Sequence, residues 1–429
     1  MSSVCIGIDI GTSACRACAV DASATIVATA RSDLAPPERD GNAVQQDPGI
    51  WWQALQDSLD TLFDALGAQC VARIAIDGTS ATLLLCSPDG TPLTHGLMYD
   101  DSRAVEAAAL IDRHAPPDSA ARGASSSLAK CLHLRARLGG QPWLALHQAD
   151  WLSGRLSGRF GISDENNALK LGYDIERRTW PEWLGRLNLL PRQLPKVVAP
   201  GTVIGTLRQE LAQRWGCGET VEIVAGTTDS SAGFVAAGAH GSGMAVTALG
   251  STLVLKVLSP HPVFAARYGI YSHRLGGHWL VGGASNSGGT VLRQLFSACD
   301  IRRFTRLLQP DMPTGLDYYP LPGIGERFPV QDPDMPPRLQ PRPASDARFF
   351  QGILEGLAAI EARGYRLLAE LGAPYPSQVV TVGGGAANTG WQHIRAAHLQ
   401  VPVSRAVHQE AAYGAALLAL RGEAVFPDP

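Results

Sequence analysis

Lysine is scarce in this chain of 429 residues, which has only Lys130, Lys170, Lys196 and Lys256. None of the four follows a glycine, so the G-x-x-x-x-G-K loop that binds phosphate in many nucleotide-binding proteins is absent. The G-x-S-x-G turn of many hydrolases and the H-E-x-x-H motif of zinc proteases are absent as well. No G-x-G-x-x-G follows the first apolar segment, so a dinucleotide site of the Rossmann type is not expected there.

Long runs of apolar or like-charged residues are missing too. Without a stretch of about 20 apolar residues, no membrane-spanning helix is expected. The net charge of −3 predicts no basic surface for nucleic acid. The first nine residues carry no basic segment or cleavage site and look like a strand rather than a signal peptide. We therefore expect a cytoplasmic protein with neither a membrane nor a nucleic acid as its partner.

The eight cysteines give no sign of a disulfide framework or of a metal site. Only Cys15 and Cys18 are close in sequence, and no second cysteine pair or histidine pair completes a zinc site. The segment 14–20 looks like a strand, in which cysteine serves as a small buried side chain. We expect a reduced protein, and whether this pair has a redox role stays open.

Strand-like and helix-like segments alternate in both halves of the chain. The clearest helix starts at Pro48, behind the capping residue Asp47, and stops at Gly67. The middle, 103–195, looks mostly helical and loop-like. Strand–helix–strand order predicts α/β domains that bind ligands at strand ends. Strands are expected at 4–9, 14–20, 25–30, 71–76, 81–86, 220–225, 245–249, 253–257 and 378–382, and further helices at 230–237, 346–371 and 409–421.

Two strand–turn–strand units of similar design, at 4–20 and 245–257, suggest that the architecture is duplicated. The natural boundary between the halves lies near residue 230. We therefore divide the chain into an N-terminal domain, 1–230, and a C-terminal domain, 231–429. A chain of this length is large enough for two domains that each bury a core.

A polar turn follows the first strand. Asp9 ends the apolar stretch, and Gly11, Thr12 and Ser13 come next. Glycine lets the backbone approach a phosphate, whose oxygens successive N–H groups and hydroxyls can hold. Asp9 can orient Mg²⁺ through water molecules, because Mg²⁺ keeps much of its hydration shell. The same residues also fit a tight hairpin with an Asx turn, so both interpretations stay open.

Asp229 lies at the junction between a strand and a helix of small residues. It follows Gly226, Thr227 and Thr228, which places it at the end of the strand. A carboxylate there can accept the proton of a substrate hydroxyl as the hydroxyl oxygen attacks phosphorus. An aspartate before a helix is also a common N-cap, and one residue can do both.

Three glycine-containing turns in the second half are candidates for nucleotide binding. The turn at 250–252 has the same chemistry as the turn after the first strand. The turn at 383–386 follows a strand, where backbone without side chains suits a flat adenine or ribose, although close packing explains it equally well. The turn at 288–289 opens a helix. The candidate residues are Gly250, Ser251, Thr252, Gly289, Arg293, Gly384, Gly385 and Asn388.

Five of the segments occur in a fixed order along nearly the whole chain: 6–13 (IGIDIGTS), 100–103 (DDSR), 226–230 (GTTDS), 250–252 (GST) and 382–386 (VGGGA). Together they resemble the motifs of the FGGY family of carbohydrate kinases, within the superfamily of actin-like ATPases and hexokinases. The resemblance implies an α/β fold of two actin-like (ribonuclease H-like) domains with a cleft between them. It also implies ATP and Mg²⁺ as cofactors and a small sugar as the substrate.

The resemblance implies a role for each matching residue. Asp229 matches the catalytic base, and Asp9 matches the aspartate that binds metal and phosphate beside the substrate. The turns that begin at Gly11 and Gly250 match two phosphate loops. The positions of Gly384, Gly385 and Asn388 match the adenosine segment, and Gly289 matches a glycine near the nucleotide. Four further residues match positions at or beside the sugar pocket: Thr79, Ser80, Asp101 and Arg103.

The chain departs from the usual family pattern around the sugar. Typical xylulose kinases carry Gln-Met-His after the glycine that matches Gly78, where this chain has Thr-Ser-Ala, and the Arg-Glu pair of glycerol kinases is absent. With the segments 125–130 and 163–167, these features resemble a short xylulokinase-like group whose members act on D-ribulose. The resemblance therefore implies phosphorylation of D-ribulose at its terminal hydroxyl, to D-ribulose 5-phosphate, with D-xylulose as the alternative.

Two other classes of protein compete with a sugar kinase. A sensor of sugars or nucleotides can be built on the same fold, and so can an ATPase of the actin or chaperone type. The retained Asp9 and Asp229 favour catalysis, and no DNA-binding module or peptide-binding domain is visible. The sequence leaves open which sugar and which hydroxyl react, and whether the chain is a monomer or a homodimer.

Overall fold

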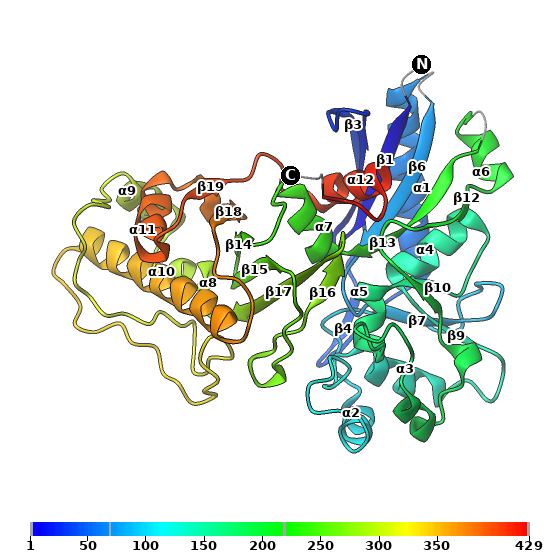
Figure 1. The fold of residues 1–429 in the computed structure, drawn as a ribbon, viewed down its shortest axis with the longest axis horizontal. Coiled ribbons are helices and arrows are strands. Elements are labelled where there is room, and N and C mark those ends of the chain that lie inside the picture. The colour runs from blue at the N-terminus through cyan, green and yellow to red at the C-terminus, as the bar shows by residue number, and fades with distance from the viewer. Residues whose placement is uncertain (1–2, 68–69, 218–219, 427–429) are drawn as a thin grey trace. The chain divides into compact units, whose positions relative to one another are not determined.

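The computed structural model describes residues 3–67, 70–217 and 220–426. They form two compact units, each built from a sheet and covering helices (Figure 1). Unit 1 contains the described residues up to Ala236, the segment His273–Gly277 and the described residues from Glu410 onward; unit 2 contains Ala237–Ser272 and His278–Gln409.

The strands of unit 1 are β1 (Val4–Ile10), β2 (Ala14–Val20), β3 (Ile26–Asp33), β4 (Glu38–Asp40), β5 (Ala43–Gln46), β6 (Val71–Gly78), β7 (Leu83–Cys86), β8 (Gly96–Leu97), β9 (Leu144–His147), β10 (Ile162–Asp164), β11 (Lys196–Val198), β12 (Val203–Thr206), β13 (Glu222–Thr228) and β16 (His273–Leu275). Its helices are α1 (Pro48–Leu66), α2 (Val105–Asp112), α3 (Ser127–Arg135), α4 (Gln148–Ser157), α5 (Glu165–Ala168), α6 (Gln209–Arg214), α7 (Asp229–Ala236) and α12 (Ala411–Arg421), with the 3-10 helices η1 (Leu169–Leu171), η2 (Glu182–Leu187) and η3 (Pro191–Gln193).

The central sheet of unit 1 has the strand order β12-β13-β6-β1-β2-β3, and a second sheet has the order β4-β5-β8-β7-β9. β1 pairs with β6 in parallel, and β6 pairs with β13 in parallel. All seven residues of β1 are buried, as expected for a strand that is covered on both faces. The carboxyl ends of these three strands therefore meet at one edge of the sheet.

Helix α12 packs directly on β1, although the two are separated by almost the whole chain (Figure 1). A Cβ atom on Gly7 would overlap the backbone of Ala412 and Ala416, so only glycine permits this close approach. A segment that follows residue 231 thus lies in unit 1. The division of the chain into domains 1–230 and 231–429 stays a prediction.

Unit 2 contains the strands β14 (Met244–Leu249), β15 (Leu253–Ser259), β17 (His278–Ser285), β18 (Gln378–Val382) and β19 (Val403–Arg405). Its helices are α8 (Gly289–Leu295), α9 (Ala298–Thr305), α10 (Asp346–Glu370) and α11 (Thr389–Leu399), with the 3-10 helices η4 (Ala266–Tyr268) and η5 (Gly384–Ala387).

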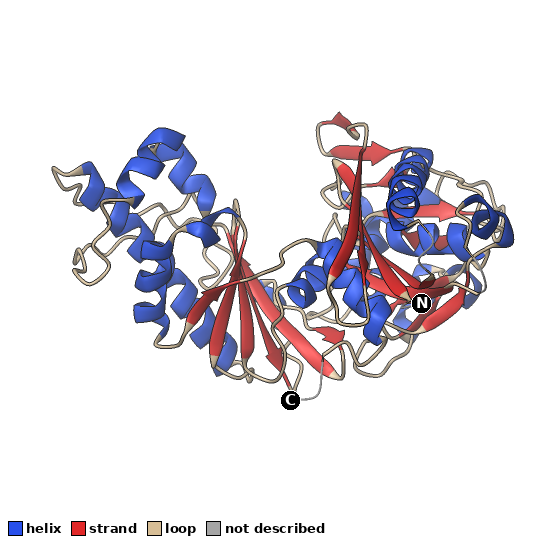
Figure 2. Ribbon diagram, turned by 90° about the horizontal axis from the view of Figure 1, so that it is seen from above, coloured by secondary structure: helices blue, strands red, loops and turns tan. Residues whose placement is uncertain are grey.

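The sheet of unit 2 runs in the order β17-β15-β14-β18-β19. β14 pairs antiparallel with β15 and parallel with β18. Figure 2 shows the twisted sheet of each unit with helices against it. The long helix α10 buries its apolar side chains in the core of this unit. The turns after β14 and β18 come out at the same end of the sheet because these strands are parallel neighbours.

Most of the predicted elements are confirmed, with shifts of a few residues at their ends. Helix α1 begins at Pro48, where the Asp47 carboxylate accepts a hydrogen bond from the Gly49 amide at 2.8 Å. The middle of the chain contains the short strands β9 and β10, which were not expected. Helices α9 and α11 and strand β17 were missed as well.

The cysteines of the predicted strand 14–20 lie in β2 and are buried, and all eight cysteines of the chain are free thiols. Burial raises the pKa of Cys15 and of Cys18 to about 12, so neither is a reactive thiolate at neutral pH. The expectation of a small buried side chain is confirmed for both.

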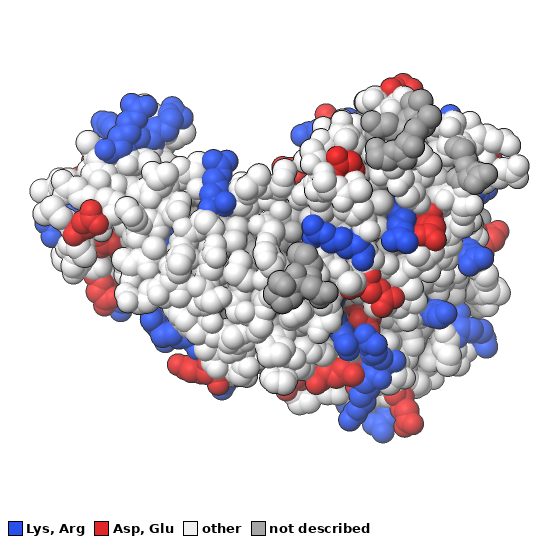
Figure 3. Space-filling view, turned by 45° about the horizontal axis from the view of Figure 1, so that its top comes forward, with Lys and Arg blue, Asp and Glu red and all other residues white. Residues whose placement is uncertain are grey.

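Charges of both signs are spread over the face shown in Figure 3, with wide areas that carry no charged residue. Such a surface gives no single-sign field on this face. Within the described ranges, no helix is both long and apolar enough to cross a membrane.

Candidate functional site

Three aspartates gather at the carboxyl edge of the central sheet in unit 1. Asp9 on β1 lies directly opposite Asp77 on β6, and Asp77 lies opposite Thr227 on β13. Asp229 follows at the first position of α7. The sequence predicts Asp9 and Asp229 as site residues, but Asp77 was missed because it looked like the polar end of an ordinary strand.

Burial and neighbouring carboxylates raise the pKa values of Asp9 and Asp77. Burial and the nearby Asp229 carboxylate raise the pKa of Asp9 to about 6. Asp77 is fully buried, and burial and Asp9 raise its pKa well above the usual range. Within the described chain, neither side-chain oxygen of Asp77 has a hydrogen-bond partner. Asp77 therefore holds a proton to higher pH than an exposed aspartate does.

Arg16 adds a positive charge beside the aspartates. Its guanidinium donates to the Asp9 carboxylate at 3.2 Å, and it lies 3.6 Å from the Glu410 carboxylate. Arg16 comes from β2, opposite Asp9 in the β1–β2 hairpin. The sequence analysis passed over it because it stands between the two cysteines. A half-buried guanidinium there can hold a phosphate oxygen.

The turn between β1 and β2 is a tight hairpin, closed by a hydrogen bond from the Gly11 amide to the Ala14 carbonyl at 3.1 Å. Gly11 and Thr12 are half-buried and Ser13 is exposed. In the described chain the Asp9 side chain is engaged by Arg16 rather than by the turn, so the Asx turn considered from the sequence is not formed.

Asp229 is half-buried, and its carboxylate accepts a hydrogen bond from the Ser230 amide at 2.7 Å. It is the first residue of α7 rather than the residue before the helix. The N-terminus of a helix stabilises a carboxylate. This contact fixes the side chain at the end of β13.

The turn after β6 is held in a strained conformation. Ala81 has a φ of 67°, which is costly for a residue with a Cβ atom. Thr79 lies 2.5 Å from the Thr82 hydroxyl and is buried, whereas Ser80 is half-buried. The buried ammonium of Lys130 donates to the Ala81 carbonyl at 2.8 Å and so holds the turn in place.

Asp101 and Arg103 are hydrogen-bonded to each other. The fully buried Asp101 accepts from the Val44 amide at 2.7 Å and from Arg103 Nε at 2.8 Å. Arg103 also donates to the Gln45 side chain at 3.0 Å and lines a cavity of about 480 Å³. The lining of this cavity contains none of the other predicted sugar residues.

Two lysines near the aspartates were not singled out from the sequence. Lys130 is fully buried, and burial lowers its pKa to about 7. Lys170 on η1 is half-buried, and burial lowers its pKa while the Asp229 carboxylate acts to raise it. Lys130 ends the segment 125–130 but was given no role of its own, and Lys170 belongs to none of the segments considered.

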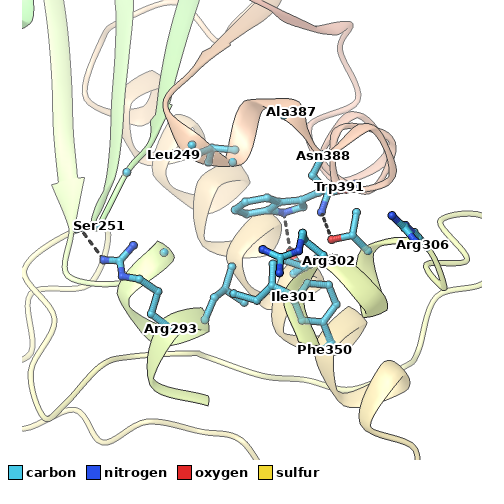
Figure 4. A pocket seen from close by; sticks show the side chains of 17 residues that line it. Leu249, Ser251, Arg293, Ile301, Arg302, Arg306, Phe350, Ala387, Asn388 and Trp391 are labelled. Atoms are coloured by element: carbon cyan, nitrogen blue, oxygen red, sulfur yellow. Dashed lines mark hydrogen bonds between the residues drawn. The ribbon is translucent and has the colours of Figure 1, made fainter. Parts of the chain in front are cut away.

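In unit 2 a pocket of about 570 Å³ opens beside the turns after β14 and β18 (Figure 4). Its volume is in the range of small-molecule sites. Of the predicted nucleotide residues of this half, Thr252 does not line the pocket. Those that do are Gly250, Ser251, Gly289, Arg293, Gly384, Gly385 and Asn388.

The pocket also has a flat apolar wall that the sequence analysis missed. Figure 4 shows the indole of Trp391 beside Ile301 and Arg302, and the indole N–H donates to the Leu354 carbonyl at 3.1 Å. Asn388 caps α11 by accepting from the Trp391 amide at 2.9 Å, which fixes the aromatic ring. These residues come from α9 and α11, two of the helices that were not predicted.

The glycines of this pocket differ in the space around them. A Cβ atom on Gly385 would lie 2.7 Å from the Trp391 ring, whereas a Cβ atom on Gly384 would meet nothing within 4 Å. Gly384 therefore faces open space, and Gly385 is needed for packing. The pocket can take a flat ring against backbone, with the arginines Arg293, Arg302 and Arg306 offering positive charge.

Family comparisons cover almost all of the chain. The model of the N-terminal domain of the FGGY family of carbohydrate kinases matches residues 4–123 and 135–236, and the model of its C-terminal domain matches residues 245–423. The chain belongs to the FGGY family of carbohydrate kinases. It is thus an enzyme of the sugar kinase class, with the α/β fold of two actin-like domains.

Individual relatives are more distant. A xylulose kinase of Escherichia coli (strain K12) is 24% identical over 410 residues, which cover 91% of this chain and 84% of that protein. A xylulose kinase of Staphylococcus xylosus is 22% identical, covering 98% and 91%. The solved structure of a xyloylose kinase from Brucella ovis matches with a TM-score of 0.89 at 23% identity, covering 98% and 90%. At this identity the structural match shows the fold alone.

Proposed function

We propose that this carbohydrate kinase transfers the γ-phosphate of ATP to a hydroxyl of D-xylulose. The observation that carries the proposal is the half-buried Asp229 carboxylate at the end of β13, which lies beside Asp9 and Asp77. D-Ribulose, the first expectation from the sequence, becomes the second choice. Relatives that cover most of the chain are named xylulose kinases, and none of the names given above is a ribulose kinase.

Asp229 acts as the general base. It accepts the proton of the attacking hydroxyl, and a positioned base of this kind contributes roughly 10²–10⁴-fold in rate. The Ser230 amide at the helix N-terminus orients this carboxylate. Arg16 and the hydroxyls of Thr12 and Ser13 stabilise negative charge on the transferred phosphoryl group.

The residues present fit Mg²⁺. Within the described residues no group of three or more His, Cys, Asp or Glu side chains has the arrangement of a metal site. Mg²⁺ in phosphoryl-transfer enzymes needs only one or two carboxylates, because phosphate oxygens and water complete its shell. Asp9 would hold it, and the bound ion would neutralise phosphate charge.

The pocket of unit 2 binds the adenosine part of ATP. Adenine lies against the backbone at Gly384, opposite the Trp391 side of the pocket, and Arg293 with Ser251 points toward the phosphates. The pocket offers few side-chain groups that read one base edge, so we expect a modest preference for ATP over other nucleoside triphosphates.

The test is sugar-dependent release of ADP from MgATP, measured with D-xylulose, D-ribulose, aldopentoses and glycerol, with the product identified by mass and by its phosphorylated position. The account predicts the largest kcat/KM with D-xylulose. A larger value with D-ribulose would keep the mechanism and return the substrate to the first expectation. ATP hydrolysis that no sugar stimulates would contradict the proposed function.

A further inference from the structure

Lys170 stands out because this chain hardly uses lysine. Four lysines occur among 36 basic residues, so arginine is the usual cation here. An ammonium is a compact charge with three donors, whereas a guanidinium is a wide planar fork. A lysine near the catalytic base therefore points to a place where a small donor is needed.

The position of Lys170 is fixed by α5. The Asp164 carboxylate caps this helix by accepting from the Asn166 amide at 2.9 Å. The Asn166 side chain donates to the Thr227 hydroxyl at 2.9 Å, which ties α5 to the end of β13 two residues before Asp229. Lys170 comes four residues after Asn166, a spacing that places both on one side of a helical turn. Its side chain thus starts on the side of α5 and η1 that faces β13.

The Lys170 ammonium has no partner of its own. Across the described chain it makes no hydrogen bond and no ion pair, although it is half-buried and Asp229 acts on it electrostatically. The distance to the Asp229 carboxylate therefore exceeds the 4.0 Å limit of an ion pair. The side chain is partly exposed, so water can serve these donors until a bound sugar oxygen replaces it as the acceptor.

Lys130 provides the contrast within the same region. Its fully buried ammonium donates to the carbonyls of Ala81, Met98 and Tyr99 at 2.8, 2.7 and 3.3 Å, which uses all three donors. The charge of Lys170 acts to lower the pKa of Lys130, so the two side chains are close. One lysine is satisfied by the protein, and the other is left with its donors available.

We propose that Lys170 selects ketoses by donating a hydrogen bond to the carbonyl oxygen of the open-chain sugar whose hydroxyl faces Asp229. The ammonium only donates and a carbonyl oxygen only accepts, whereas a hydroxyl can also pair with other groups. A hydroxyl at this position also carries a proton that the ammonium cannot accept, so the site leaves that proton unpaired and penalises the reduced sugar. No covalent bond to the lysine is involved. The inference rests on the proposed function, since it concerns the sugar of that reaction.

The test compares a ketopentose with the corresponding alditol, in which the carbonyl is reduced to a hydroxyl. Wild type, Lys170→Met and the control Lys196→Met are assayed for kcat and KM with both compounds. Lys196 lies on β11 with an exposed side chain, so its variant removes a lysine without touching the site. Methionine keeps the unbranched stem of lysine and removes only the charge.

We expect Lys170→Met to lower kcat/KM for the ketose roughly 10- to 100-fold, as expected for the loss of a charged hydrogen bond. Activity with the alditol should change by less than about twofold, so the preference for the ketose collapses, and Lys196→Met should match wild type. A fall that is equal for both compounds, or no fall for either, would overturn the role of Lys170 while leaving the kinase intact.

Failure of the proposed function looks different, because wild type itself would then show no sugar-stimulated turnover. Thermal melting and ATP binding of each variant report on folding. If Lys170→Met has a lower melting temperature than wild type, the kinetics of Lys170→Gln are measured instead, because glutamine keeps a neutral hydrogen-bond donor. That variant should retain part of the ketose preference, and an unchanged preference would contradict the role of the charge.

Discussion

The polar edge of unit 1 and the pocket of unit 2 are both built from turns after parallel strands, yet their side chains differ in kind. In unit 1, Asp9, Asp77 and Asp229 lie close together, and burial and the neighbouring carboxylates raise the pKa values of Asp9 and Asp77. The lining of the pocket in unit 2 contains no aspartate or glutamate and is mostly apolar. The difference supports our proposal that unit 1 carries the proton chemistry and that unit 2 supplies a surface for the adenine ring.

The largest expected effect is a loss of turnover when the aspartate site of unit 1 is changed. Asp229→Ala should lower kcat roughly 10²–10⁴-fold, because the proton acceptor is lost. ATP affinity should change little, since the adenosine pocket lies in unit 2. Steady-state kinetics and calorimetric titration with ATP measure the two quantities. A loss of ATP binding as large as the loss of turnover would reduce Asp229 to a structural role.

A buried ion pair in unit 2 shows how much a buried charge contributes to the stability of the protein. In unit 2, Arg395 and Glu361 are about 1% exposed and share two hydrogen bonds of 2.6 and 2.7 Å. Arg395→Met leaves the Glu361 carboxylate buried without its partner, and we expect a loss of about 3–5 kcal/mol in the free energy of unfolding.

The matched control for this variant is the exposed ion pair of Arg342 with Asp346, four residues apart on the chain. Arg342→Met should cost less than about 0.5 kcal/mol, because solvent screens the pair. Chemical denaturation of both variants measures the difference. Equal losses would contradict the claim that burial, rather than pairing, sets the cost.

The space at Gly384 tests the pocket of unit 2. Gly384→Leu should fill open space and raise the Kd for ATP roughly 10-fold or more, because one tenfold step corresponds to about 1.4 kcal/mol of lost contact. Gly323→Leu is the control, since a Cβ atom there also meets nothing within 4 Å and the residue is exposed outside the pocket. Unchanged ATP binding in Gly384→Leu would remove the nucleotide from this pocket.

The acid limb of the rate profile reports on Asp9. Its pKa is raised to about 6, so kcat/KM should fall about tenfold for each pH unit below that value as the carboxylate takes up a proton. The apparent value belongs to the coupled aspartates rather than to one of them. An inflection near pH 4 in a profile of log kcat/KM against pH would show that the carboxylates do not interact.

The smallest effect concerns the stability cost of Asp77. Its folded pKa is raised above the unfolded value, so the folded state binds an extra proton and loses stability as pH rises above about 4. Asp77→Asn removes this cost and should raise the melting temperature at pH 7, by roughly 2–4 °C for each kcal/mol relieved. At pH 4 the gain should vanish, and a loss at pH 7 would contradict the raised pKa of Asp77.

Sequence reasoning found the residues that stand in turns after apolar strands, because strand patterns and turn residues are local. Asp9, Asp229 and the glycines at 384 and 385 belong to this group. It missed Lys170, which lies in a short 3-10 helix without a periodic pattern. It also missed Trp391, because α11 has apolar residues that pack against α10 rather than a clear amphipathic repeat. Such residues are placed by tertiary contacts that one sequence does not reveal.

The central claim is the division of labour between the two sites, and it is tested most directly by measuring turnover and ATP affinity together in Asp229→Ala and Gly384→Leu. The account predicts that the first variant binds ATP like wild type and hardly turns over. It predicts that the second binds ATP weakly and regains most of its kcat at saturating ATP. If both variants lost turnover and ATP affinity alike, the assignment of chemistry to unit 1 and of nucleotide binding to unit 2 would be contradicted.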